Sequence, residues 1–111
     1  MNTFVINDRR YTAKEFTFGT IRKFEGLGLS MADIQNKPMT LVAAYLSYCA
    51  NISIEAADEE INEHILKDGS FEEILKIITE EMNNSRFFQH LNKKKETEDQ
   101  ETQEIEASVT E

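Results

Sequence analysis

The sequence predicts a predominantly α-helical α+β domain, in which an N-terminal β-hairpin is followed by about four helices and a disordered acidic C-terminal tail. Three observations predict this class. Two short β-rich runs flank an Asn-Asp pair near the N-terminus, apolar residues then recur at helical spacing, and a charged run begins at Lys93. We therefore expect one small domain over residues 1–92 and a tail over residues 93–111.

The hairpin is expected to pair residues 3–6 with residues 9–12 across the Asn-Asp pair at residues 7–8. Asn and Asp both tolerate the left-handed backbone that a two-residue hairpin turn requires. With this turn Phe4 lies opposite Tyr11, and the aromatic pair can cover a helix. Because an isolated hairpin is marginal in water, it must pack on the rest of the domain.

The four helices are expected from apolar faces together with start and stop signals. Pro suits the first turn of the second helix, Ser caps the third and the fourth, and Gly follows the first and the third. The second helix has the broadest apolar face and is expected to be central and buried. The expected spans are Thr17 to Glu25, a helix from Pro38 through Cys49, a helix capped by Ser53 with Lys67 in its last turn, and a helix from Ser70, in a capping box with Glu73, to about Leu91.

The tail cannot bury enough apolar surface to offset the entropy of ordering its backbone. The chain up to Asn92 has nine basic and fourteen acidic residues, and the rest has three lysines and seven acids, so both parts are acidic. An acidic chain without a basic patch is a poor partner for nucleic acid or an anionic membrane. A single cysteine, the absence of a signal-peptide pattern and the absence of a long apolar run predict a cytosolic protein.

Candidate catalytic or metal-binding residues are few. Glu60, His64 and Asp68 are one helical turn apart, but a second His or a Cys at ligand spacing is missing, so a solvated charged helix face is the favoured interpretation. Cys49 has no basic neighbour in sequence and is expected to be a packed side chain. His90 is expected at the surface. We predict no enzyme activity, no cofactor and no metal, and binding becomes the leading class of function.

One stretch, NNSRFFQHL, indicates a partner. Adjacent Phe87 and Phe88 point about 100° apart on a helix, so a narrow core stripe does not easily take both. Either both pack under the hairpin, or they form an exposed aromatic patch that can dock a partner. The partner-binding residues expected from exposed apolar placement are Phe24, Leu27, Leu29, Phe87, Phe88 and Leu91.

The order of these parts resembles the tail assembly chaperones of long-tailed, siphovirus-type phages of Gram-positive hosts. The resemblance covers roughly residues 3–91 and starts from FVINDRRYTAKEFTFGTIRKFEGLGLS. Such sequences commonly begin with a strand, an Asn-Gly-type turn, a strand with an aromatic residue, and a Phe-Gly-containing helix with Arg and Glu. The matching residues are Asn7-Asp8, with Asp8 where Gly is usual, Tyr11, Phe18-Gly19, Arg22 and Glu25.

The resemblance implies a chaperone that binds the tape-measure protein, keeps it soluble and helps recruit tail tube subunits in the host cell cytoplasm, without entering the mature virion. Members of the family are often made in a short form and in a form extended by a ribosomal frameshift. The Lys93–Lys95 run is either encoded by a slippery stretch, which would give a longer form that contacts the tail tube protein, or a basic boundary before a solubility tail.

Two alternative functions come from other classes. A head-tail connector or tail completion protein would stay in the particle, and self-association is left open by the sequence. A small acidic inhibitor that mimics nucleic acid would need its acids on one face, whereas the helices mix Lys and Arg among theirs.

Overall fold

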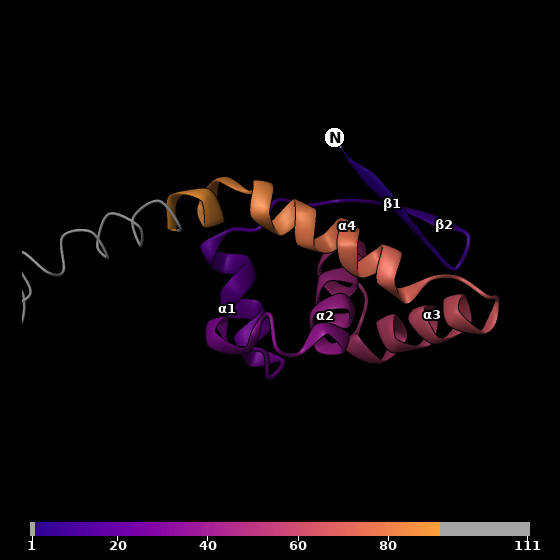
Figure 1. Ribbon diagram of the computed structural model, residues 1–111. Helices are drawn as coiled ribbons and strands as arrows, with labels where there is room; N and C mark the ends of the chain where they lie inside the picture. The colour runs from indigo at the N-terminus through magenta and orange to yellow at the C-terminus, as the bar shows by residue number, and fades with distance from the viewer. Residues whose placement is uncertain (1, 92–111) are drawn as a thin grey trace, which may run out of the picture.

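The computed structural model describes residues 2–91, and its elements follow the predicted order (Figure 1). The predicted class, a predominantly helical α+β chain with an N-terminal hairpin, is confirmed. The predicted tail, and with it the Lys93–Lys95 run, lies outside the described residues. The elements are β1 (Thr3–Ile6), β2 (Arg9–Thr12), α1 (Phe18–Gly26), a 3₁₀ helix η1 (Met31–Asp33), α2 (Pro38–Ala50), α3 (Ile54–Leu66) and α4 (Phe71–Asn84), and residues 86–91 are again helical.

The hairpin has the predicted register. β1 and β2 pair antiparallel with Phe4 opposite Tyr11, and the two ring centroids are 5.7 Å apart. Asn7 and Asp8 have φ angles of 55° and 63°, the pair of left-handed residues that a two-residue turn needs. Phe4 and Ile6 face the core and are buried. The hairpin is therefore packed on the helices, as an isolated two-stranded sheet has to be.

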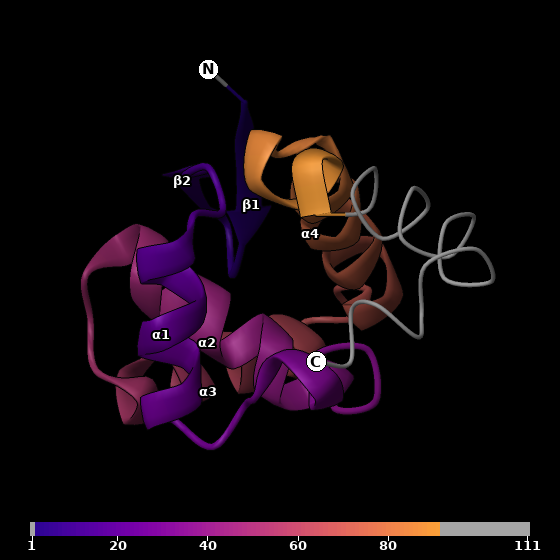
Figure 2. The same ribbon diagram turned by 90° about the vertical axis from the view of Figure 1, so that its left-hand side faces the viewer.

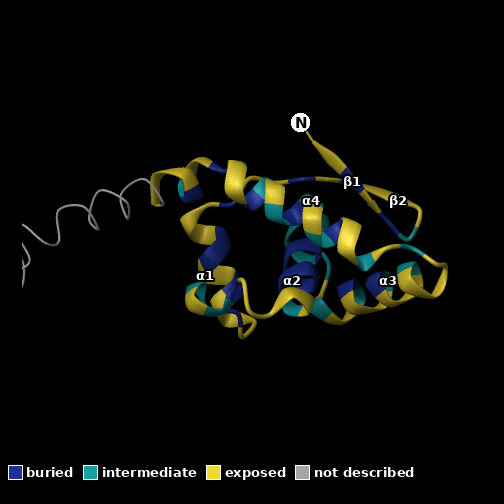
Figure 3. Cartoon of the chain, in the orientation of Figure 1, coloured by how far each residue is buried: buried dark blue, intermediate teal, exposed yellow. Residues whose placement is uncertain are grey.

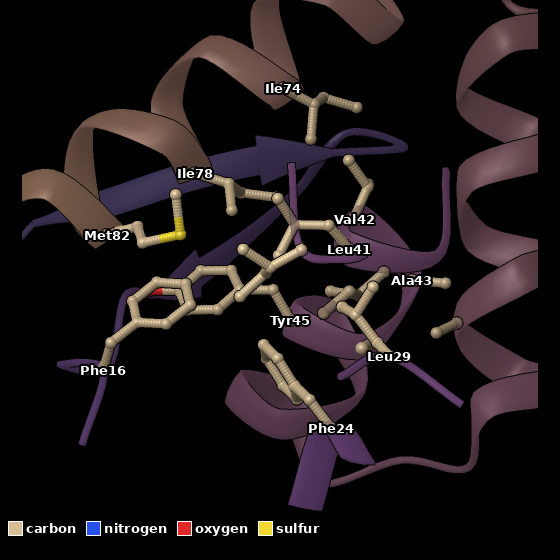
Figure 4. Close-up of a cluster of buried hydrophobic side chains, with 14 of the residues drawn as sticks. Phe16, Phe24, Leu29, Leu41, Val42, Ala43, Tyr45, Ile74, Ile78 and Met82 are labelled. Carbon is tan, nitrogen blue, oxygen red and sulfur yellow. The ribbon is translucent and has the colours of Figure 1, made fainter. Parts of the chain in front are cut away.

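The central helix is α2, as predicted. α1, α3, α4 and β2 all pack against it (Figures 1 and 2), and its residues 41–46 form a continuous buried stretch (Figure 3). Tyr45 lies at its middle, stacked on Phe16 with 4.8 Å between ring centroids (Figure 4), and donates a hydrogen bond of 2.7 Å to the carbonyl oxygen of Lys14. This contact holds the segment between β2 and α1 against α2.

The turn of the hairpin is held by α3. The backbone N–H of Asn7 donates to Nδ1 of His64 at 2.9 Å, and the Asn7 amide donates to the Glu60 carboxylate at 3.1 Å. Arg9 adds an ion pair of 2.9 Å to Glu60. The prediction of a solvated charged face is therefore wrong for Glu60 and His64, because the hairpin covers both. Gly69 leaves the space for this arrangement, since a Cβ at that position would overlap the His64 ring.

Helix caps follow the sequence with one exception. Ser53 and Ser70 each accept a hydrogen bond of 3.1 Å from the backbone N–H three residues on, as predicted. The reciprocal bond from Glu73 to the Ser70 backbone is absent from the described part of the chain. A reciprocal capping box occurs instead at α1, where Thr17 and Thr20 bond each other's backbone N–H groups at 3.0 and 3.3 Å.

The last helix is shorter than predicted. α4 ends at Asn84, because Ser85 has an extended backbone with φ −69° and ψ 146°. Its buried hydroxyl donates to the carbonyl oxygen of Met82 at 2.7 Å and accepts from the backbone N–H of Phe88 at 3.2 Å. Ser85 thus closes α4 and caps the helical turn of residues 86–91, which takes a new direction.

Candidate functional site

The candidate site is a groove of about 550 Å³ between the segment that leads into α1 and the helical turn of residues 86–91. In Figure 1 the orange turn lies beside the start of α1. We call this feature the aromatic groove. Its lining residues are Glu15, Phe16, Thr17, Phe18, Arg86, Phe87, His90 and Leu91.

The break at Ser85 gives the two adjacent phenylalanines different environments. Phe88 is 7% exposed and packs edge-on against Phe16, with 5.9 Å between ring centroids. Phe87 is half-buried and lies edge-on to Phe88 at 5.2 Å and to Phe18 at 6.5 Å. The sequence left open whether both rings pack in the core or both form an exposed patch. In the structure Phe88 belongs to the core, and Phe87 forms part of the groove.

An ion pair joins the two walls of the groove. Nε and Nη2 of Arg86 donate to the Glu15 carboxylate at 3.1 and 3.0 Å, and the backbone N–H of Arg86 donates to it at 3.0 Å. These bonds, with the Arg86 side chain first, lower the pKa of Glu15 to about 2. The same carboxylate raises the pKa of Arg86. Both groups are charged near neutral pH, so the pair can link the two walls there, as an exposed contact of modest strength.

The groove presents large apolar side chains to solvent. Phe18 is 66% exposed and Leu91 is 39% exposed, beside the half-buried Phe87. Behind them Phe16 is fully buried, so the exposed rings stand on a packed aromatic base. A clustered apolar surface of this kind, in contrast to a single exposed residue, is a candidate docking surface.

The structure separates the six predicted partner-binding residues into two groups. That prediction assumed that all six side chains are exposed. The assumption is wrong for Phe24, Leu29 and Phe88, which belong to the core. Phe24 is fully buried because this face of α1 packs on α2, where its ring meets Tyr48 edge-on at 6.4 Å. It also meets Phe16 edge-on at 6.0 Å. Leu29 is fully buried, and its N–H bonds to the Phe24 carbonyl at 2.9 Å, which folds the chain back after the helix.

The remaining three residues keep an accessible surface. Leu27 is 41% exposed after the end of α1, and Phe87 and Leu91 line the aromatic groove. Phe18 is an exposed apolar residue of the groove that is absent from the predicted set, because it shares helical spacing with the buried Ile21. A signal was available: as the first residue of α1, directly after the Thr17 cap, it projects where no preceding turn covers it.

The two side chains with raised pKa values near the core, Cys49 and Tyr45, are packed within the fold. Burial raises the pKa of the Cys49 thiol, which therefore stays protonated near neutral pH. Burial also raises the pKa of Tyr45, whose hydroxyl bonds to Lys14. Within residues 2–91, no group of three or more His, Cys, Asp or Glu side chains is placed to hold a metal ion. In the same range, no helix has the length and apolar character needed to cross a bilayer.

Comparison of the chain with protein-family models, with curated proteins and with solved structures gave no match. The resemblance to tail assembly chaperones therefore stays a prediction from the sequence.

Proposed function

We propose that this protein is a tail assembly chaperone of a long-tailed phage, which binds the tape-measure protein, keeps it soluble and helps recruit tail tube subunits. The observation that carries the proposal is the aromatic groove, in which Phe18, Phe87 and Leu91 are accessible above a buried aromatic base. The order of sequence elements that resembles this family supports it. The protein would act in the host cell cytoplasm and be absent from the mature virion.

The groove suits the apolar face of a partner helix. In helix-in-groove recognition, anchors at i, i+3, i+4 and i+7 enter an apolar channel, and the rest of the helix stays in water. Phe18 and Leu91 lie on the two walls, which are joined by the buried Phe16–Phe88 contact and by the exposed Glu15–Arg86 pair. A long helical protein with repeated apolar stripes presents many such faces, and a small chaperone can cover one at a time.

The charge of the chain supports the same function. The protein has a formal net charge of −9, and like-charged complexes repel one another. An apolar helix covered by several copies of an acidic protein would therefore stay dispersed in solution. In this proposal a longer form of the protein, made by ribosomal frameshifting, recruits the tail tube protein. A slippery heptamer at the Lys93–Lys95 codons, with an open shifted frame downstream, would support this part of the proposal.

The test is co-expression with the long helical protein encoded just downstream of the gene. We expect the wild-type chain to keep that protein soluble and to copurify with it. The double variant Phe18→Ser with Leu91→Ser removes the exposed apolar walls and should abolish copurification, while the Glu15–Arg86 pair is left intact. The matched control is Val5→Ser, an apolar residue on the hairpin that is 46% exposed.

Each outcome decides between functions. Copurification with the wild type and with Val5→Ser, lost in the double variant, supports both the chaperone function and the groove. Copurification that survives the double variant keeps the chaperone function but places the binding site elsewhere. If the partner aggregates with every variant and the protein is found in purified particles by mass spectrometry, the chaperone proposal fails and a connector or tail completion protein takes its place.

A further inference from the structure

The hairpin leaves one edge of its sheet open, on β2. The sheet has two strands, and the main contacts of α3 and α4 with it are to β1, whereas those of α2 are to β2. In Figure 2, β2 lies on the side of β1 that faces away from α4. A strand at an open edge presents backbone N–H and C=O groups that can pair with another strand.

The unpaired backbone groups of β2 can be assigned from the register of the hairpin. The backbone N–H of Ala13 donates to the carbonyl oxygen of Asn2 at 2.9 Å. Hydrogen-bonded pairs alternate with non-bonded pairs along an antiparallel ladder, so Arg10 and Thr12 belong to non-bonded pairs. Their N–H and C=O groups point away from β1, and none of these four groups makes a hydrogen bond among residues 2–91.

A pocket of about 630 Å³ lies beside this edge, and we call it the edge pocket. Arg9 and Tyr11 of β2 line it, and they share the inner face of the sheet with their buried partners Ile6 and Phe4. The apolar lining from the helices is Ala50, Ile52 and Ala56. Because side chains alternate between the two faces of a sheet, a strand added to β2 would direct every second side chain toward this pocket.

Two contacts show which part of the edge pocket lies at which end of β2. Arg9, at the start of the strand, pairs with Glu60 of α3 at 2.9 Å. Lys14, just after its end, donates to the carbonyl oxygen of Tyr48 in the last turn of α2 at 3.2 Å. The apolar lining at the junction of α2 and α3 therefore lies toward the end of β2, and the acids of α3 lie toward its start.

The acids of the edge pocket outnumber its cations. Glu59, Glu60 and Glu63 line it together with a single cation, Arg9. Arg9 is paired with Glu60, and neither Glu59 nor Glu63 forms an ion pair within residues 2–91. On the outer face of β2, Arg10 is exposed and has no ion pair in the same range. A strand that pairs with β2 would therefore meet an excess of carboxylates on its inner side and a cation on its outer side.

We propose that the open edge of β2 binds an extended segment of a partner protein as a third, antiparallel strand, in which an apolar residue, an acid and a Lys or Arg follow in that order. The apolar residue lies opposite Tyr11, the acid opposite Arg10 and the cation opposite Arg9, on the acidic side of the edge pocket. Backbone hydrogen bonds hold the strand, and the pocket selects its inward side chains. This inference does not depend on the proposed function, because the edge pocket shares no lining residue with the aromatic groove.

Two other occupants fit this edge less well. A second copy that pairs through its own β2 would set two cationic strands side by side, since Arg9 and Arg10 make up half of the strand. The C-terminal segment of the same chain, residues 93–111, has seven acids and three lysines, and it would add carboxylates to Glu59 and Glu63. A partner strand with the alternating charges described above avoids both conflicts.

The probe is a capped peptide of about nine residues, with Val-Glu-Lys at its centre and Thr on both sides. A matched peptide has Val-Lys-Glu at its centre, which keeps the composition and net charge but turns the acid toward the edge pocket. It should bind at least about tenfold more weakly. A third peptide is the first one N-methylated at its Glu, which removes the donor opposite Arg10 and should abolish binding.

Amide hydrogen exchange of the full chain, followed by NMR, measures occupation of the edge. With the Val-Glu-Lys peptide at about ten times its dissociation constant, exchange of the Arg10 and Thr12 amides should slow about tenfold. The amide of Val5 is the control, since it also lies in a non-bonded pair but points away from β2, and its exchange should not change.

Variants separate the edge pocket from general attraction to an acidic protein. Glu59→Gln with Glu63→Gln removes the unpaired carboxylates and should weaken the Val-Glu-Lys peptide at least about threefold. Glu72→Gln with Glu80→Gln is the matched control, because it removes two acids of α4 and should leave this affinity unchanged. All four positions are exposed, so both variants should fold, and their thermal midpoints check this.

Three results would overturn the inference. One is equal binding of the Val-Glu-Lys and Val-Lys-Glu peptides, no binding of either, or an unchanged affinity in Glu59→Gln with Glu63→Gln. Another is binding that survives N-methylation or leaves the Arg10 and Thr12 amides as fast as before, which would place the peptide away from the edge. The third is slow exchange of these two amides in the free chain, which would assign the edge to a second copy if it depends on protein concentration, and to a segment of the same chain if it does not.

Discussion

Arg86 holds Glu15 across 71 residues of sequence, with three hydrogen bonds of 3.0 to 3.1 Å that involve both its guanidinium and its backbone N–H. The pair ties the segment before α1 to the helical turn after α4. These two parts of the chain form the walls of the aromatic groove. The shape of the proposed binding site is therefore linked to one charged pair at the surface.

The first prediction concerns pH. The pKa of Glu15 is lowered to about 2 by Arg86, below the value of about 4.3 for an unfolded Glu. The stabilisation of the folded state by the Glu15–Arg86 pair is then fully present above the pKa of Glu15 in the unfolded chain. It is lost as the pH falls through the pKa of Glu15 in the folded chain. We expect the difference in free energy of unfolding between wild type and Glu15→Gln, measured in urea, to shrink steadily from about pH 5 to about pH 2.

Arg86→Gln is the control for this prediction. In that background the cause of the lowered pKa is absent, so Glu15→Gln should no longer produce a difference that disappears at low pH. A difference with the same pH dependence in both backgrounds would show that the shift does not come from Arg86.

The hairpin and the central helix could be predicted because their signals are local. Asn7 and Asp8 take positive φ angles with little strain, Pro38 fits a first helical turn, and Ser53 and Ser70 cap the helices that they precede. Each signal involves residues within a turn or two of each other. A single sequence therefore contains enough information to place these elements.

The candidate site could be predicted only in part, because burial depends on contacts between distant segments. Phe24 and Phe88 both lie against Phe16, and nothing near either residue in sequence indicates this. The break at Ser85 also lacks a Pro or Gly to mark it. The run Asn83-Asn84-Ser85 was the available signal, since these side chains compete with the helix for backbone hydrogen bonds.

The second prediction concerns the hairpin turn. Asp8 has a φ of 63°, where a residue with a side chain carries a penalty that Gly does not. Asp8→Gly should leave stability unchanged or raise it slightly, because the exposed contact with Lys67 contributes little. Asp8→Val puts a β-branched residue in the same backbone and should cost about 1–2 kcal/mol. Equal thermal midpoints for both variants would contradict this account of the turn.

The third prediction concerns the contact between the hairpin and α3. His64→Ala removes the acceptor for the Asn7 backbone N–H, which lies 2.9 Å from Nδ1 in a partly buried site. An unpaired N–H of this kind should cost about 1–3 kcal/mol in free energy of unfolding. His90→Ala is the matched control, since His90 is exposed, and should change stability by less than about 0.5 kcal/mol. The same loss in both variants would remove the role assigned to His64.

The fourth prediction concerns the core face of α4. Ile78 is fully buried against α2, so Ile78→Ala should cost about 2–5 kcal/mol. Leu66→Ala removes a similar side chain that is 69% exposed, and should stay within about 0.5 kcal/mol of wild type. Urea denaturation measures both. An unchanged midpoint for Ile78→Ala would show that this face of α4 is not core.

The last prediction links the break after α4 to the aromatic groove. Ser85→Ala removes the hydroxyl that bonds Met82 and Phe88, and should cost about 1–3 kcal/mol because Ser85 is buried. Ala also favours a continuous helix, which would turn Phe87 away from Phe18. Ser70→Ala, which removes an exposed N-cap, should cost about 1 kcal/mol without this rearrangement. Nuclear Overhauser contacts between the two rings should therefore disappear in Ser85→Ala and remain in Ser70→Ala. Their persistence in Ser85→Ala would mean that the groove forms without the Ser85 hydroxyl, through the Phe16–Phe88 contact and the Glu15–Arg86 pair.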